Sequence, residues 1–162
     1  MQIRKISKGD VRGFIDCYVE IWESLKGILP EEYVNDQIEK ASGNIFQDDL
    51  LSKTSDPVSI FLVAEVGTET IGLAWGNIRK YGSSWLSFLG VSPDHRRKGV
   101  GKSLLTRFIE ESKKKGSRKI RLDTDPRLIP ALKLYENMGF IPEGITKNPY
   151  GLELIIYGKV IE

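Results

Sequence analysis

The fold of this chain can be inferred from the stretch Val91-Ser92-Pro93-Asp94-His95-Arg96-Arg97-Lys98-Gly99-Val100-Gly101-Lys102-Ser103. A strand is predicted to end at Val91, and an amphipathic helix is predicted to begin at Gly99. The first N–H groups of a helix lack intrahelical partners and carry the positive end of its dipole. Gly99 and Gly101 let the backbone approach a ligand with no Cβ in between, and the three cations from Arg96 to Lys98 add positive charge. The stretch therefore predicts an anion cradle suited to a pyrophosphate.

Two familiar phosphate-binding motifs do not fit this stretch. A Walker loop has a glycine five residues before the glycine of Gly101-Lys102-Ser103, and this chain has Arg96 there. A dinucleotide-binding fingerprint has a third glycine at position 104, which is Leu104 here. The predicted anion cradle therefore belongs to neither of these two motifs.

The spacing Arg96-x-x-Gly99-x-Gly101 resembles the acetyl-CoA-binding motif of the GNAT superfamily of N-acetyltransferases. A second segment, Ala131-Leu132-Lys133-Leu134-Tyr135-Glu136-Asn137-Met138-Gly139-Phe140, is similar to the family's Ala-x-x-Leu-Tyr-Glu-x-x-Gly-Phe pattern. Each motif alone is moderately specific, whereas the two together, with a strand between them, are strongly specific. The resemblance is clear over residues 85–146.

The resemblance implies the roles of particular residues. It implies that Tyr135 is catalytic and points its hydroxyl at the sulfur of coenzyme A, and that the backbone of Leu89 and Val91 pairs with the pantetheine amides. Backbone N–H groups of residues 97 to 102 would hold the pyrophosphate. The residues expected to bind acetyl-CoA are Leu89, Gly90, Val91, Arg96, Arg97, Lys98, Gly99, Val100, Gly101, Lys102, Ser103 and Tyr135.

The hydrophobic pattern of the rest of the chain predicts a series of strands and helices. Strands are predicted at residues 2–6, 60–66, 71–80, 85–91, 118–123, 140–145 and 150–160, and helices at 11–25, from Pro30 to about 42, 99–115 and 126–138, while residues 43–57 show no clear pattern. We expect one α/β domain over residues 1–162, with a mixed, mostly antiparallel sheet of six to seven strands and about four helices. The resemblance further implies a splay between the fourth and fifth strands.

Composition limits the classes of function. The 24 Lys and Arg residues against 22 Asp and Glu give a formal charge of +2, which favours neither nucleic acid nor an anionic membrane as a partner. Cys17 is the only cysteine and His95 the only histidine, which argues against a disulfide, a histidine-based zinc site and a Ser–His–Asp triad. With one histidine and one cysteine, the chain is expected to need no metal. Because it lacks a long apolar run and a signal-peptide core, it is expected to be cytoplasmic.

The proton route departs from the family pattern. Many members carry Glu on the fourth strand where this chain has Ser87, and their frequent Asn before the second motif corresponds to Leu128. Glu23 and Asp123 are left as candidates for a proton relay. The pKa of a phenol is near 10 and that of a thiol near 8.5, so full proton transfer from Tyr135 to the thiolate would be uphill by roughly 2 kcal/mol. Tyr135 is therefore expected to act first as a hydrogen-bond donor.

Aromatic and apolar residues are the candidates for acceptor binding, namely Trp22, Ile28, Tyr33, Trp75 and Tyr150. In the family, two loops frame the acceptor, and these correspond to residues 26–30 and 147–150. Neither loop contains an acid, which argues against a polycationic acceptor. We predict acetyl transfer to a primary amine of a small molecule. The alternatives are a peptide or protein N-terminal or lysine acetyltransferase and a non-catalytic CoA-binding regulatory module, and a homodimer is a further expectation from the family.

Overall fold

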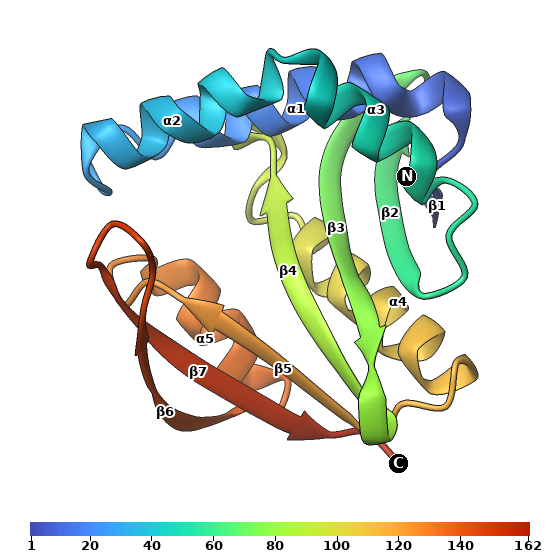
Figure 1. Ribbon diagram of the computed structural model, residues 1–162, viewed down its shortest axis with the longest axis vertical. Coiled ribbons are helices and arrows are strands. Elements are labelled where there is room, and N and C mark those ends of the chain that lie inside the picture. Colours follow the sequence, from blue (N-terminus) through green and yellow to red (C-terminus); the bar gives the residue numbers. More distant parts are fainter.

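The computed structural model describes residues 1–162 as one seven-stranded sheet with helices on both faces (Figure 1). The strands are β1 (Gln2–Lys5), β2 (Ser59–Val66), β3 (Glu69–Arg79), β4 (Ser83–Val91), β5 (Lys119–Thr124), β6 (Ile141–Lys147) and β7 (Glu153–Val160). The α-helices are α1 (Val11–Glu23), α2 (Glu31–Ala41), α3 (Asn44–Lys53), α4 (Val100–Lys114) and α5 (Ile129–Asn137). Short 3-10 turns span Lys8–Asp10, Lys80–Gly82 and Pro93–His95. None of the helices has the length and apolarity required to cross a bilayer.

The strand order is β1-β2-β3-β4-β5-β7-β6, and every neighbouring pair is antiparallel except β4 and β5. The parallel ladder between β4 and β5 joins only Ser83–Leu86 to Lys119–Leu122. Beyond Leu86 and Leu122 the two strands diverge, as Figure 1 shows above their contact. The mixed sheet and the splay between the fourth and fifth strands are therefore confirmed.

A β-bulge lies at the point where the strands part. Trp75 and Gly76 are consecutive on β3, yet they oppose Phe88 and Leu86, so Ser87 is an extra residue on β4. A bulge bends its strand and increases the local twist. Gly76 allows the close approach that this geometry requires, because a Cβ there would lie 1.9 Å from the Trp85 carbonyl oxygen. The bulge thus turns the end of β4 away from β5.

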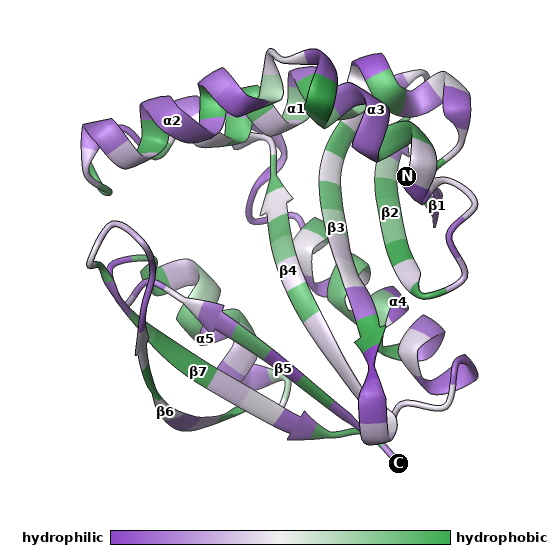
Figure 2. Cartoon of the chain, viewed as in Figure 1, coloured by the Kyte–Doolittle hydropathy of each residue, from purple (hydrophilic) through white to green (hydrophobic).

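Two apolar clusters cover the two faces of the sheet. One joins α4 and α5 to the sheet around Leu104, Phe108 and Leu122, and the other joins α1, α2 and α3 to the opposite face around Phe14 and Val63. Figure 2 shows the hydrophobic segments of β2 and β3 that lie between these helices. Each fully buried Leu or Phe side chain contributes about 1.5–3 kcal/mol to folding.

The expected elements are found with one omission and small shifts. The unassigned stretch contains α3, so the structure has five α-helices where about four were expected. The signal was weak because Leu50 is the only buried residue of α3, which leaves no repeated apolar stripe. α5 begins at Ile129 rather than at Pro126, since the preceding turn is held by Asp125, which accepts hydrogen bonds from the backbone and side chain of Arg127.

The start of the chain is fixed by an ion-pair network around Arg4. The Arg4 guanidinium donates two 2.7 Å hydrogen bonds to the two oxygens of Asp10 and further bonds of 3.0 and 3.1 Å to Glu65 on β2. The Ser7 N–H also donates to Asp10, over 2.7 Å. The hydrogen bonds from Arg4 are the largest cause that lowers the pKa of Asp10 from 3.8 to about 2.

This network predicts a pH-dependent stability. A carboxylate whose pKa is lowered by folding stabilises the fold above its unfolded pKa, and that contribution is lost as the pH falls through the folded pKa. Asp10→Asn should therefore cost about 1–2 kcal/mol of unfolding free energy at pH 7, and most of this deficit should be lost between pH 4 and pH 2. Urea unfolding of both proteins across that range measures it.

The matched control is Asp16→Asn, because the pair between Arg12 and Asp16 is long, at 3.6 Å, and highly exposed. Its cost should stay below about 0.5 kcal/mol. A deficit for Asp10→Asn that is equal at pH 7 and pH 2 would contradict the role given to this network.

Candidate functional site

The loop between β4 and α4 has an unusual backbone. Arg97 has φ 62° and Gly99 has φ 80°, both in the left-handed region. Glycine adopts this conformation freely, whereas a residue with a side chain pays about 1–2 kcal/mol. Gly99 precedes the first turn of α4, and a Cβ built on it would meet no atom within 4 Å. The loop therefore presents the N-terminus of a 15-residue helix beside an open space lined by cations.

Arg96 ties this loop to its neighbours. Its Nε donates to the Val91 carbonyl over 2.9 Å, and its Nη2 donates to Ser24 Oγ over 2.7 Å at the end of α1. Ser24 Oγ in turn donates to the Ile21 carbonyl. Arg96 is thus a brace between the loop, the end of β4 and α1, with two of its donors already used.

The end of β4 offers unpaired backbone on its β5 side. The Ser92 N–H donates to the Ile71 carbonyl on β3, so strand alternation turns the backbone groups of Val91 and Leu89 toward the splay. Gly90 lies between them against α1, where a Cβ would come within 2.9 Å of Ile21 Cδ1. This edge therefore faces the opening between β4 and β5.

Tyr135 lies on α5 at the other side of the opening. It is 6% exposed and packs edge-to-face against Phe140, with ring centroids 5.9 Å apart, and beside Tyr157. Burial first, and then the negative charge of Asp123, raise the pKa of its hydroxyl. The hydroxyl is therefore firmly protonated at neutral pH and available as a hydrogen-bond donor.

Three of the predicted acceptor residues come together. The rings of Trp22 and Tyr33 meet edge-to-face at 5.4 Å, and those of Tyr33 and Tyr150 at 4.9 Å. Tyr150 donates its hydroxyl to Asp36 Oδ2 over 2.7 Å, which links the β6–β7 loop to α2. Asn148 shapes that loop by accepting hydrogen bonds from the N–H groups of Tyr150 and Leu152.

The other two predicted acceptor residues are Trp75 on β3 and Ile28 in the loop between α1 and α2. Trp75 is stacked between Phe61 and Phe88, at centroid distances of 5.5 and 4.5 Å, as part of the packing between sheet and α1. Ile28 is 48% exposed on the α1–α2 loop. Leu128 precedes α5, and Ser87 is the exposed residue of the bulge.

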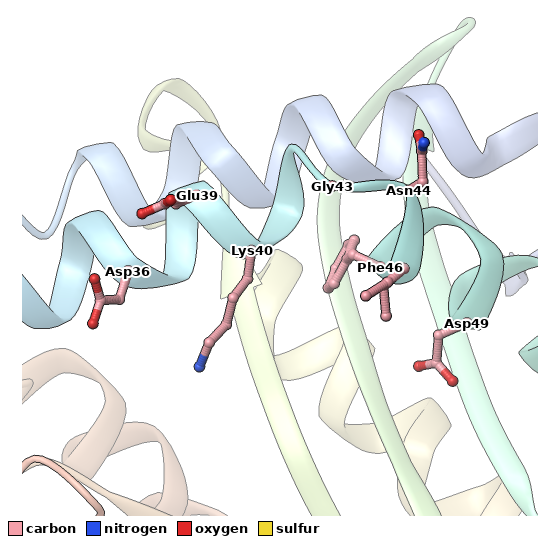
Figure 3. Close-up of a pocket in the computed structure, with 8 residues that line it drawn as sticks. Asp36, Glu39, Lys40, Gly43, Asn44, Phe46 and Asp49 are labelled. Carbon is pink, nitrogen blue, oxygen red and sulfur yellow. The ribbon is translucent and has the colours of Figure 1, made fainter.

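A pocket of about 750 Å³ at the junction of α2 and α3 contains none of the residues singled out from the sequence. It is lined by Asp36, Glu39, Lys40, Gly43, Asn44, Ile45, Phe46 and Asp49. Figure 3 shows Lys40 and Asp49 projecting from the two helices on the same side. Its three acids, Asp36, Glu39 and Asp49, come from α2 and α3 and not from the two loops considered for the acceptor. In the sequence these acids look like ordinary solvated helix faces.

Known proteins share this architecture. The model of the acetyltransferase (GNAT) family matches residues 15–140. The structure of PaiA N-acetyltransferase from Thermoplasma acidophilum in complex with coenzyme A is 28% identical, with a TM-score of 0.83 over 98% of both chains.

Two more distant structures share the fold. The ribosomal-protein-S18-alanine N-acetyltransferase from Escherichia coli is 18% identical, with a TM-score of 0.73 over 99% of this chain and 94% of that one. The aminoglycoside 6'-acetyltransferase type Ii is 21% identical, with a TM-score of 0.74 over 100% and 98%. The family match covers most of the chain and includes the loop before α4 and the Tyr135 segment. The chain therefore belongs to the GNAT family of acetyltransferases, whose fold binds acetyl-CoA.

Proposed function

We propose that this protein transfers an acetyl group from acetyl-CoA to a primary amine of a small molecule. The observation that carries the proposal is the position of two features on either side of one opening. The cationic loop with its left-handed Arg97 and Gly99 lies at the end of β4, and the protonated Tyr135 hydroxyl lies on α5. An anion cradle and a proton donor at one opening suit a thioester carried by a phosphorylated cofactor.

The loop fits the pyrophosphate of coenzyme A. Free N–H groups at the start of α4 and the charges of Arg97, Lys98 and Lys102 would hold it, and the space in front of Gly99 leaves room for it. Arg96 plays a different part, since its guanidinium braces Val91 and Ser24. Its contribution is to hold the loop in the shape that receives the anion.

The end of β4 fits the pantetheine arm. The Leu89 backbone and the Val91 N–H face the splay and would pair with its amides as an added strand does. The Val91 carbonyl already accepts the hydrogen bond from Arg96 and is not counted among the free groups. When bound, acetyl-CoA supplies an acyl carbon that is activated toward attack by an amine.

Tyr135 would serve the leaving sulfur. Because its pKa is raised further above that of a thiol, the hydroxyl donates a hydrogen bond to the developing thiolate before any proton moves completely. Trp22, Tyr33 and Tyr150 would then line the approach of the acceptor from the side of α2.

Thiol release from acetyl-CoA against a panel of amines tests the proposal, with mass spectrometry of the products. The panel contains amino acids, amino sugars, polyamines, lysine peptides and peptides with free N-termini. Acetylation of a small amine supports the proposal. Acetylation of peptides alone would favour the protein acetyltransferase, and coenzyme A binding without turnover would favour the regulatory module.

Arg97 gives the first prediction for this site. Arg97→Gly removes one cation and also relieves the left-handed strain, which offsets the greater freedom of glycine in the unfolded chain. The unfolding free energy should stay within about 1 kcal/mol of the wild type. The affinity for coenzyme A should fall about fivefold to tenfold, since one charge near a phosphate contributes about 1 kcal/mol or more. Thermal unfolding and titration calorimetry measure the two effects.

Arg97→Lys is the matched control, because it keeps both the charge and the Cβ. It should retain most of the affinity. Equal affinity of the glycine variant and the wild type would show that position 97 does not face the bound anion.

Tyr135 gives the second prediction. Tyr135→Phe should lower kcat about 100-fold or more, as expected for loss of a proton donor, and change the Kd for acetyl-CoA less than about threefold. Tyr157→Phe is the control, because it removes a hydroxyl from a neighbouring buried ring whose bond goes to Glu136. Steady-state kinetics with calorimetry separates the effects. Unchanged turnover in Tyr135→Phe would remove this residue from the mechanism.

A further inference from the structure

The opening between β4 and β5 contains one carboxylate that the roles above do not use. The last pair of the parallel ladder is Leu86 with Leu122, so Ser87 and Asp123 are the first residues of their strands beyond it. Ser87 is the extra residue of the bulge and carries no ionisable group. The backbone of Asp123 is held on the opposite edge of β5, where it pairs with Ile156 of β7. The opening between β4 and β5 is called the fork below. The Asp123 carboxylate therefore lies where the fork begins, on a strand that is still paired on its other side.

Asp123 faces the acceptor side of the sheet. Its neighbour Leu122 is buried in the cluster beneath α4 and α5, and successive side chains on a strand point to opposite faces. After burial, the charge of Asp123 is the next largest cause that raises the pKa of Tyr33 on α2 and of Tyr135 on α5. The Asp123 carboxylate is therefore close enough to influence both the acceptor-side Tyr33 and the Tyr135 hydroxyl electrostatically.

The Asp123 carboxylate also has no side-chain partner. It is exposed to solvent and makes no side-chain hydrogen bond or ion pair, whereas Asp125 is bound by Arg127 at 2.7 Å and Glu143 by Lys119 and Arg121. Desolvation within the fork raises its pKa, and the charge of Arg79 on β3 opposes this shift. Glu23, the other carboxylate considered from the sequence, forms a 3.0 Å ion pair with Lys26. Of the two carboxylates considered from the sequence, only Asp123 is unpaired.

We propose that Asp123 is the catalytic residue that accepts the proton of the incoming amine, in the place where many relatives have a glutamate on the fourth strand. The inference rests on the acetyl transfer proposed above. An amine with a pKa near 10.4 is only about 0.1% neutral at pH 7.5, so it arrives as an ammonium ion and must lose a proton before it attacks. A carboxylate facing the acceptor pairs with the ammonium and accepts this proton in a step that is uphill by several pKa units and is completed when the proton passes to solvent.

The protons balance over the whole reaction. The ammonium gives its first proton to the Asp123 carboxylate, which later releases it to solvent. The amine nitrogen then forms the C–N bond with the acetyl carbon as the C–S bond breaks. The nitrogen loses a second proton, and the leaving sulfur gains one from the Tyr135 hydroxyl, which is reprotonated through water. The products are an N-acetyl amine, a free thiol and one proton in solution.

Asp123→Asn tests the proposal, because the change is isosteric at an exposed position and should leave the fold and the Kd for coenzyme A unchanged. We expect kcat/KM to fall about 100-fold at pH 7 with a primary amine that the wild type acetylates. The variant depends on the neutral amine, so its rate should rise about tenfold per pH unit below the amine pKa, and the deficit should shrink accordingly. The charged and titratable groups that face Asp123 are Arg79, Tyr33 and Tyr135.

Two variants act as controls. Glu143→Gln removes a carboxylate outside the fork and should leave kcat unchanged, whereas Asp123→Glu keeps the carboxylate one methylene away and should recover part of the rate. An Asp123→Asn variant that raises only KM, with kcat and the pH profile of the wild type, would overturn the inference and leave acetyl transfer intact. A wild type that acetylates no amine in the panel would overturn both.

Discussion

The architecture of this protein depends on the early end of the hydrogen-bonded ladder between β4 and β5. Four residue pairs hold these two parallel strands together, and the ladder stops where Ser87 is inserted into β4. Beyond the bulge β4 continues to pair with β3, while β5 continues along β7. The resulting fork leaves backbone donors and acceptors of β4 without a strand partner in the middle of a sheet. Unpaired backbone in such a place is costly unless a ligand or water satisfies it, which makes the fork a candidate binding site.

The two sides of the fork, β1–β4 and β5–β7, are joined at its base and at its open end, and the space between remains open. At its base, β4 and β5 pair directly, and Gly76 permits the close approach of β3 and β4. At its open end, the contacts among Tyr33, Tyr150 and Asp36 connect α2 to the β6–β7 loop. The chemistry proposed here uses both sides of this opening. The loop before α4 and Tyr135 would serve the thioester, whereas Asp123 and the aromatic residues near α2 would serve the amine.

Much of the fold was predictable, because its signals are local. The strands, the loop with Gly99 and Gly101 and the Tyr135 helix follow from periodicity, glycine positions and two motifs. α3 was missed because a helix with one buried residue has no apolar stripe. The brace formed by Arg96 and the contact of Tyr150 with Asp36 join residues far apart in the chain, so no local pattern indicates them. The stacking of Trp75 between Phe61 and Phe88 also joins residues from three strands, so no local pattern indicates it.

Amide hydrogen exchange with and without coenzyme A shows whether the cofactor lies in the fork between β4 and β5. Binding there should slow exchange at the N–H groups of Leu89 and Val91 and of residues 97 to 102. Exchange along β6, the outer edge of the sheet, should stay unchanged. Protection confined to another region, such as the pocket between α2 and α3, would mean that coenzyme A binds outside the fork, and so would binding with no protection at Leu89 and Val91.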